Sequence, residues 1–529
     1  MQRGTVVLLA VCAACSGTIG DVGGSDDDDR ERPGACSGSR CPEEPGELVL
    51  PTFAELASYD RLTKPEYRYV VADLLEGTDA SAALAAVDAF AENNYAGYYQ
   101  NHTYLQAEPR LAALQLSLAS ALATAFPRSD TYRALCTANN CGPALVDRLL
   151  PRIWKRAISP EERVTLLEEH AELPETLFLT RVFASPFFHF KIFAQTPETP
   201  REVARKHANL LSFSIAGTFV DEAMQADLDA GQLDDPAGFE PHVRRLLATH
   251  PRRFARLFLP QWLGLSSLAE QADEYDGVAL RKVMAEPAEL FAALLVDGED
   301  VGPLLAADFQ VVESDLANLY DLDAPTEGWA RRDGRATLFG TAALSALFVD
   351  HETGFPNPIR RGSYVVNRLL CRDIRFPSSA VQSEIDAILE SVPEGLSPPE
   401  RMAYLRSHDT CASCHEQFDH HGLALEEIGA LGETLTTYYT GDPIEASGSV
   451  GELHYASSLD FAQQLGHSRE LQTCFAAQVH TYFAGGSHVE SNRRLRAHSD
   501  LVYGATIEDV VVDAALRALP RTEAAGEER

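Results

Sequence analysis

The stretch LAALQLSLASALATAF, residues 111–126, contains neither glycine nor proline and consists largely of alanine and leucine. These residues have high helix propensity, and an unbroken run of this length predicts a helix. The same apolar periodicity recurs at 203–213, 242–249 and 252–259, with Pro251 separating the last two segments. Helices are therefore expected well beyond the opening stretch.

Helix starts are also marked in the sequence. Thr63-Lys64-Pro65-Glu66 places a threonine at the N-cap and a proline inside the first turn, and Ser159-Pro160-Glu161-Glu162 repeats this pattern. Strand patterns are few, and residues 309–312 form one candidate. We predict an all-α fold of successive multi-helical units, without a repeat of fixed period.

The chain is too long for one compact core, because 529 residues correspond to about three or four domains. Segments rich in Gly, Pro, Asp, Asn or Thr predict breaks between units. They lie near 130–143, 194–203, 325–334 and 435–452.

The N-terminus predicts export. Arg3 precedes a short apolar run, and small residues lead to Cys15, which is typical of a secretory signal peptide at 1–14. Ala13-Ala14-Cys15 resembles a bacterial lipobox, in which Cys15 would be acylated. However, Cys12 stands where Leu or Val is usual, and simple cleavage near Ala14 is the alternative. No later stretch reaches roughly 18 apolar residues, so no transmembrane helix is expected.

The composition limits the classes of partner. A net charge of −34 would repel phosphates, which argues against nucleic acid or an anionic membrane surface as the main partner. The charge is typical of a solvated surface, and the alternative is docking to a basic partner such as a small cationic electron carrier. Membrane contact is expected only through the N-terminal lipid anchor.

The motif with the clearest chemistry is Cys411-Ala412-Ser413-Cys414-His415. Two thiols at this spacing can add to the vinyl groups of haem, while the next residue offers its imidazole to the iron. A zinc site is the rival interpretation, but no second Cys-x-x-Cys pair follows to complete four ligands. We therefore expect one covalent c-type haem on Cys411 and Cys414, with His415 as the iron ligand.

The second axial ligand is open. The chain has four methionines, and none follows the motif. Histidines that follow it are His420, His421, His454, His467, His480, His488 and His498. Among these, His480 lies in an apolar-patterned helix at 474–483 and is the candidate for an inward-facing position, whereas a hydrogen-bonded or exposed side chain is the favoured interpretation for each of them. His408 precedes Cys411 by three residues, a position better suited to a haem propionate than to the opposite haem face.

Six cysteines remain after the signal, the lipid site and the haem motif are set aside. In an oxidising compartment an even remainder predicts disulfides. Their spacing favours Cys36–Cys41 and Cys136–Cys141 as local pairs, which leaves Cys371 with Cys474, unless these two are buried thiols.

Other constellations are weaker. His420-His421 after Asp419 is expected at the haem rim or surface rather than in a metal cluster, and Asp350-His351-Glu352 is interpreted as a polar loop. The sequence lacks a glycine-rich phosphate loop, a Gly-x-Ser-x-Gly elbow and a His-Glu-x-x-His motif, so no catalytic residue is identified.

Several stretches, taken in order, carry a resemblance. They are Arg61–Tyr67 with Asp73–Leu75, Arg156–Glu162, Ala184–Phe188 with Leu211–Phe213 and Gly231–Leu233, Arg252–Leu265, Asn357–Gly362 with the haem motif, and Cys474 with Tyr482–Gly485. Together they resemble a family of large exported proteins known mainly as consecutive domains of unknown function, numbered 1587, 1595, 1592, 1588 and 1585. The resemblance covers most of residues 60–515 and implies a single haem in the fourth unit, an envelope location and no established reaction.

This sequence departs from the family pattern after the motif. The family usually reads Asp-Pro-x-Gly, often with Met before the Asp, whereas here Phe418 precedes Asp419-His420-His421-Gly422. The closing Gly-Arg of the family is Gly485-Gly486. These departures leave haem attachment intact and put the distal ligand and any shared active site in doubt.

The leading hypothesis is an exported monohaem cytochrome-like protein that transfers electrons in the periplasm or at the outer membrane. A haem-dependent oxidoreductase with an unknown substrate and a surface binding protein with a structural haem are the alternatives. The expected organisation is a signal peptide (1–14), a disordered acidic tether (15–47), helical units (48–141, 142–200 and 201–328), a haem-attachment unit (329–440), a C-terminal helical unit (441–515) and a disordered tail (516–529).

Overall fold

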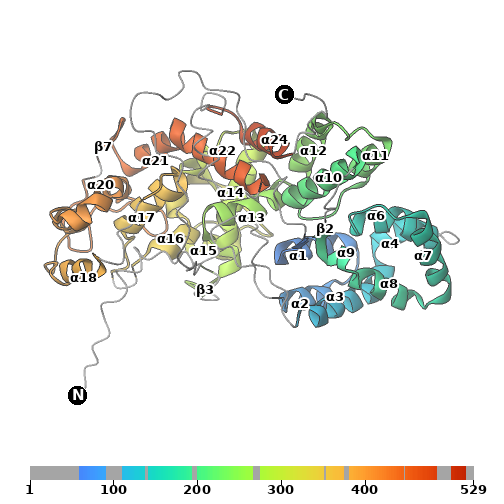
Figure 1. Ribbon diagram of the computed structural model, residues 1–529. Helices are drawn as coiled ribbons and strands as arrows, with labels where there is room; N and C mark the ends of the chain where they lie inside the picture. Colours follow the sequence, from blue (N-terminus) through green and yellow to red (C-terminus); the bar gives the residue numbers. More distant parts are fainter. Residues whose placement is uncertain are drawn as a thin grey trace, which may run out of the picture. The chain divides into compact units, whose positions relative to one another are not determined.

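Helices dominate the computed structural model (Figure 1). The structure describes residues 59–90, 110–136, 141–192, 199–265, 268, 274–350, 353–374, 381–445, 447–484 and 502–519. In these ranges, strands occur as four two-stranded antiparallel sheets. The prediction of a mostly helical fold is confirmed, while the signal peptide, Cys15 and the tether lie outside the described residues.

The chain divides into two compact units. The N-terminal unit takes the described residues within Pro51–Phe258, Val479–Ser487 and Glu508–Arg529, and the C-terminal unit takes those within Leu259–Gln478 and His488–Ile507. Each unit is thus built from stretches that are distant in sequence. The successive units expected from the composition breaks stay a prediction.

Among its described residues, the N-terminal unit contains the end of α22 (Arg469–Ala484) and α24 (Ile507–Ala518) from Glu508 onward. Its other α-helices and its two short strands lie within Pro51–Phe258. They are β1 (Tyr59–Arg61), α1 (Lys64–Leu74), α2 (Ser81–Asp88), α3 (Leu111–Ala125), α4 (Asp130–Leu135), α5 (Cys141–Ala144), α6 (Leu150–Ile153), α7 (Pro160–Glu172), α8 (Glu175–Ala184), α9 (Pro186–His189), β2 (Phe190–Ile192), α10 (Pro200–Ala216), α11 (Glu222–Ala230), α12 (Glu240–Thr249) and the first part of α13 (Pro251–Trp262).

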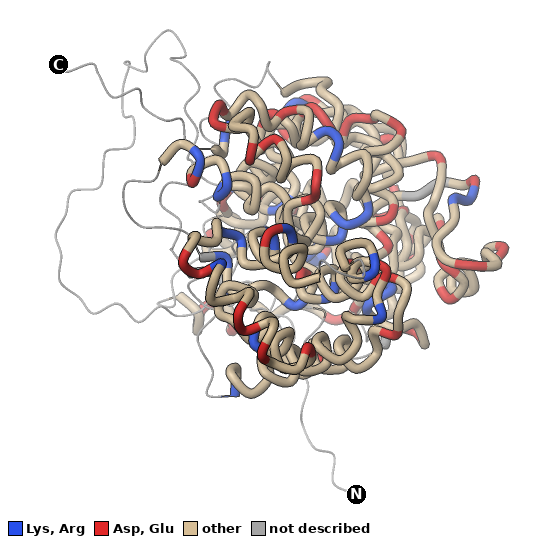
Figure 2. The backbone as a smooth tube through the Cα atoms, turned by 90° about the vertical axis from the view of Figure 1, so that its right-hand side faces the viewer, with Lys and Arg blue, Asp and Glu red and all other residues tan. Residues whose placement is uncertain are grey.

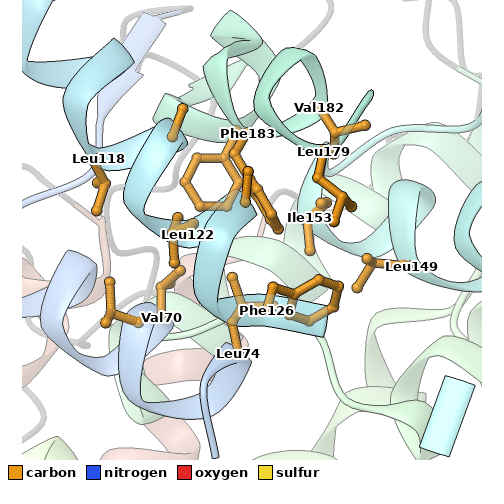
Figure 3. Packing of buried hydrophobic residues seen from close by; sticks show 14 of the residues in the cluster. Val70, Leu74, Leu118, Leu122, Phe126, Leu149, Ile153, Leu179, Val182 and Phe183 are labelled. Atoms are coloured by element: carbon orange, nitrogen blue, oxygen red, sulfur yellow. The ribbon is translucent and has the colours of Figure 1, made fainter. Parts of the chain in front are cut away.

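Helix α3, formed by the opening stretch of the sequence analysis, lies at the centre of a core in this unit. It packs against α8, and side chains of α1 and α6 complete the cluster (Figure 3). The buried residues labelled there are Val70, Leu74, Leu118, Leu122, Phe126, Leu149, Ile153, Leu179, Val182 and Phe183. Burying one such side chain contributes about 1.5–3 kcal/mol, so this cluster is a main source of the unit's stability.

Both predicted helix starts are present. The Thr63 hydroxyl accepts a hydrogen bond from the backbone nitrogen of Glu66 at 3.4 Å, and the Glu66 carboxylate accepts one from the backbone of Thr63 at 2.7 Å. Ser159 caps α7 in the same way, by accepting from the backbone nitrogen of Glu162 at 3.2 Å. These bonds satisfy amide groups that have no partner inside the helix.

A buried ion pair ties the first helix of the N-terminal unit to a strand far along the chain. Lys191 of β2 donates to Glu66 of α1 at 2.7 Å, and both side chains are at most 2% exposed. β2 pairs with β1, with Tyr59 opposite Ile192. Removing either charge would leave the other buried without a partner, which is costly.

The C-terminal unit combines helices with three short antiparallel sheets among its described residues. Its elements are the end of α13, β3 (Glu274–Tyr275), β4 (Val278–Ala279), α14 (Leu280–Asp297), β5 (Ala307–Val312), α15 (Ser314–Leu319), β6 (Ala330–Ala336), α16 (Ala342–Phe348), α17 (Pro358–Tyr364), α18 (Gln382–Glu390), α19 (Pro398–Arg406), α20 (Asp409–Leu423), β7 (Gly448–Val450), β8 (Leu453–Tyr455), α21 (Ser458–Gly466) and most of α22 (Arg469–Ala484).

The strand predicted at 309–312 is β5, which pairs with β6. The break expected near 325–334 overlaps the start of β6, which pairs with β5 on the other side of α15. α24 (Ile507–Ala518) passes the boundary expected at residue 515, since its last turn includes the buried Ala518.

A buried carboxylate joins three helices of the C-terminal unit. Glu286 of α14 accepts the Tyr320 hydroxyl at 2.6 Å and the backbone N–H of Ala342, the first residue of α16, at 3.0 Å. Burial raises the pKa of Glu286 to about 8, although both hydrogen bonds act in the opposite direction. The side chain fixes the start of α16 against α14 and the residue that follows α15.

Two of the predicted disulfides are present, Cys136–Cys141 and Cys371–Cys474. The second joins the segment after α17 to α22 across 103 residues, so the alternative of two buried thiols is wrong. Cys36 and Cys41 lie outside the described residues.

Charged residues of both signs are interspersed along the described chain (Figure 2). Some of the acidic side chains form exposed ion pairs, such as Asp234 with Arg201 at 2.9 Å. Exposed pairs of this kind contribute at most about 1 kcal/mol each, so they do not determine the fold.

Candidate functional site

The motif Cys411–His415 lies on α20 in the C-terminal unit. Cys411 is 8% exposed and Cys414 is half-buried, and neither belongs to a disulfide. Residues three apart on a helix lie on one face, so both sulfurs are presented on the same side of α20. Burial raises the pKa of the Cys411 thiol, and the nearby Cys414 adds to this effect.

Two small apolar clusters meet at the cysteines. Cys414 packs against a cluster formed by Val366, Ile374 and Phe418. Cys411 belongs to a second cluster with Ile388 and Leu405. Ile359 of α17 contacts both clusters, and it therefore lies at the point where the surroundings of the two sulfurs join.

Helix α17 crosses α20 at very short distance. A Cβ atom added to Gly362 would lie 3.0 Å from the backbone nitrogen of Gly422, and one added to Gly422 would lie 2.8 Å from the carbonyl carbon of Pro358. Only glycine at these two positions lets the backbones approach so closely. The crossing brings Ile359 onto the face of α20 that carries the cysteines.

The imidazole of His415 is held by a buried carboxylate. Its Nδ1 atom lies 2.9 Å from Oδ1 of Asp419, one helical turn further along α20. Asp419 is 0% exposed, and its other oxygen accepts a hydrogen bond from Arg406 of α19. An ionised carboxylate can only accept, so Nδ1 carries the proton and Nε2 is the nitrogen left for a metal.

The segment after α20 is fixed by a buried arginine. Arg361 of α17 is 0% exposed and donates to the carbonyl oxygens of Leu425 at 3.1 Å and Ile428 at 2.6 Å. It also reaches the carbonyls of Phe339 and Gly429 at 3.2 and 3.3 Å. Burial lowers the pKa of Arg361 to about 10, with Glu426 and Glu433 acting in the other direction, so the group stays charged near neutral pH.

His408 has an unsatisfied ring nitrogen. Its Nε2 atom is buried and has no hydrogen-bond partner within the described ranges, and its ring packs against Tyr404 with centroids 5.1 Å apart. The residue is the N-cap of α20, so it lies next to Cys411. Other histidines among the described residues, His421 of the same helix included, also have a buried ring nitrogen without a hydrogen-bond partner, so this feature alone does not mark His408 as a ligand-binding residue.

The other candidate histidine ligands are exposed, lie outside the described residues, or are buried. His420, His454 and His467 are exposed, and His488 and His498 lie outside the described residues. His480 is 1% exposed, as expected for an inward-facing position, but it belongs to the N-terminal unit.

His421 is the second buried histidine of α20, besides His415. It is 6% exposed, and burial lowers its pKa to about 4. His420 and His421 therefore differ, because one faces solvent and the other faces the interior.

The chemistry of these donors fits a c-type haem. Two neighbouring sulfurs that pack against apolar side chains, and an imidazole with its Nδ1 proton engaged, are groups of the kind that hold a c-type haem. The unsatisfied His408 nitrogen adds a polar group at the start of the same helix.

The sequence did not identify Asp419 and Arg406 as site residues, because Asp419 stood out only as the neighbour of two histidines and as part of the family pattern after the motif. The signal was present, since a carboxylate four residues after a histidine on a helix faces it. Arg406 lies on a different helix, and its spacing from His415 carries no such signal.

A second group of donors lies in the N-terminal unit. Ligand atoms of Cys141, His170 and Glu175 fall within 4.8 Å of one another. However, Cys141 is bonded to Cys136, and a disulfide sulfur lacks the thiolate charge that binds metals. Of the loop Asp350-His351-Glu352, only Asp350 lies within the described residues.

Within the described ranges, every helix falls short of the length and apolar character that a bilayer-spanning segment requires. Comparison with curated proteins and with solved structures found no match. Comparison with family models found two matches, each described as a protein of unknown function: residues 204–322 match DUF1592, and residues 335–438, which include the motif and Asp419, match DUF1588. Two of the five domains named by the resemblance are therefore present, in the expected order.

Proposed function

We propose that this protein carries one covalent c-type haem on Cys411 and Cys414, with His415 as an iron ligand, and transfers electrons. The observation that carries the proposal is the arrangement of α20. One helix presents both sulfurs between two apolar clusters and holds the imidazole through Nδ1, so that Nε2 is left for the metal.

Each group has a distinct part in this proposal. Cys411 and Cys414 would hold the haem through thioether links to its two vinyl groups. Ile359 and its neighbours supply apolar surface for the macrocycle, and they keep water from the sulfurs. When bound, the haem supplies an iron that accepts and releases one electron. His408 is placed to donate a hydrogen bond to a propionate, which would satisfy its unpartnered nitrogen.

The cell envelope is the proposed location. The N-terminal sequence has the pattern of a signal peptide with an acylated Cys15, and both disulfides within the described residues are consistent with an oxidising compartment. A net charge of −34 favours a basic redox partner, because opposite charge speeds the encounter of two proteins. We therefore propose a small cationic electron carrier as the partner.

The test is haem staining and absorption spectroscopy of the protein produced with c-type maturation machinery. Wild-type protein is expected to stain after denaturing electrophoresis and to shift its absorption on dithionite reduction. Cys414→Ala loses one thioether and is expected to stain weakly or not at all. The matched control is the double change Cys136→Ala and Cys141→Ala, which removes two closely spaced cysteines of a disulfide outside the motif and should leave staining intact.

Colourless wild-type protein in which both thiols of the motif react with an alkylating reagent would end this proposal. Equal staining of Cys414→Ala and wild type would also contradict the thioether assignment.

A further inference from the structure

The carboxylate of Asp419 is buried between two side chains, those of His415 and Arg406. Asp419 is completely buried, and its two oxygens are divided between two partners, with Oδ1 at 2.9 Å from Nδ1 of His415 and Oδ2 accepting from Arg406. Burying a carboxylate is costly unless it is paired, so a protein keeps such a group only with partners like these. Both partners are side chains, and one of them is the proposed iron ligand.

The geometry fixes the imidazole in two ways. Because the acceptor lies on Nδ1, the ring proton stays on that atom and Nε2 keeps its lone pair for the iron. Because Asp419 lies one helical turn after His415 on α20, the same contact also limits rotation of the ring about its side-chain bonds.

We infer that Asp419 is a positioning residue that strengthens electron donation from His415 to the haem iron and thereby lowers the reduction potential of the protein. This inference depends on the proposed function. A carboxylate that accepts the Nδ1 proton makes a ligating imidazole more basic, and a more basic ligand favours ferric over ferrous iron. Arg406 opposes this effect, because its positive charge makes the Asp419 carboxylate a weaker acceptor for the Nδ1 proton of His415.

A through-space effect must be separated from the hydrogen bond. Any negative charge close to the iron favours the ferric state, with or without a contact to His415. Glu416 provides a matched control, since it is the residue after His415 on the same helix and its side chain is exposed. Glu416→Gln removes one negative charge near the site and leaves Nδ1 and Asp419 unchanged.

The experiment compares wild type, Asp419→Asn, Asp419→Glu and Glu416→Gln, each produced with c-type maturation machinery. A spectroelectrochemical titration gives the potential, and resonance Raman spectroscopy of the ferrous protein gives the iron–histidine stretch. Asp419→Asn is expected to raise the potential and lower the stretching frequency, because an amide accepts the Nδ1 proton weakly. Asp419→Glu restores a carboxylate and should recover part of both changes.

Arg406→Gln provides an independent test if Asp419→Asn does not fold. Without the guanidinium, the Asp419 carboxylate interacts with His415 alone. The reduction potential is therefore expected to fall and the iron–histidine stretching frequency to rise, which is the opposite of the result expected for Asp419→Asn. Arg401→Gln on the same helix α19 is the charge control, and it should leave the stretch unchanged.

The outcomes separate this inference from the proposed function. A haem-bearing Asp419→Asn whose potential and iron–histidine stretch match those of Glu416→Gln overturns the inference and leaves the proposed function standing. An Arg406→Gln variant that behaves like Arg401→Gln overturns it equally. Wild-type protein without haem overturns both.

Discussion

The crossing of α17 and α20 predicts that a single methyl group will loosen the motif-bearing helix. Gly422→Ala would place a Cβ atom 2.8 Å from the carbonyl carbon of Pro358, and closer still to its oxygen. Real Cβ atoms essentially never approach another atom within 3.0 Å, and the opposing group is backbone, which cannot rotate away. The two helices must therefore separate, on the order of 1 Å, and Ile359 moves away from both cysteine clusters with α17.

The expected cost can be worked from two opposing terms. Overpacking of a close contact typically costs about 1–3 kcal/mol, and the upper end applies where a whole helix must shift. Replacing glycine by alanine in a helix returns up to about 1 kcal/mol. A net loss of about 2 kcal/mol remains, which corresponds to a roughly 30-fold larger equilibrium constant for local opening.

Hydrogen exchange followed by mass spectrometry on the whole protein measures this opening. Peptides from α17 and α20 should lose protection in Gly422→Ala, while Ser413→Ala, on the exposed face of α20, should leave it unchanged. Gly362→Ala tests the other side of the same crossing. One separation of the helices accommodates both methyl groups, so the double variant should cost little more than the worse single variant. Unchanged protection in Gly422→Ala, or strictly additive losses in the double variant, would refute this reasoning.

Two further predictions concern buried charge and acid sensitivity. Arg361→Met leaves four carbonyl oxygens without their charged donor, at a cost of about 1.5–3 kcal/mol for each such hydrogen bond. We therefore expect a large decrease in the urea concentration at the midpoint of unfolding. An unchanged midpoint would contradict the stabilising role of Arg361. Burial lowers the pKa of His207 to about 4. Between about pH 6.5 and pH 4, the unfolded chain therefore binds a proton at this residue that the folded chain does not bind. The contribution of His207 to the free energy of unfolding consequently falls as the pH drops through this range. His207→Leu should flatten that part of the stability curve, measured by urea unfolding at pH 7 and pH 4.5, whereas an unchanged acid slope would exclude His207 as a source.

Most features that sequence alone predicted correctly are encoded over short distances, and the exception is the disulfide Cys371–Cys474, which followed from pairing the cysteines that were left. The helix at 111–126, the caps at Thr63 and Ser159, and the short-loop disulfide Cys136–Cys141 each depend on neighbours within a few residues. Propensity, capping and loop length act at that range, so the pattern and the structure agree.

The arrangement that builds the site depends on contacts the sequence does not display. Arg361 reads as one of two adjacent arginines in a helix start, yet it is buried because carbonyls 64 to 68 residues later surround it. Gly362 and Gly422 look like ordinary helix-weakening glycines until the two helices cross. Arg406 meets Asp419 only because α19 packs against α20. Tertiary packing decides these roles, and the local sequence around each residue contains no trace of them.

These contacts have a common consequence for the motif. The glycine crossing, the Arg361 bonds to the segment after α20, and the Asp419 bridge to α19 each hold the helix through groups of the protein itself. None of the three requires a porphyrin, so the direction of His415 is set before any cofactor arrives. A ligand held in advance loses little conformational freedom on binding, and its hydrogen-bond acceptor is already in place. For the proposed haem, the protein would therefore supply a fixed ligand geometry, and the electronic properties of the iron would depend on how Asp419 is shared between His415 and Arg406.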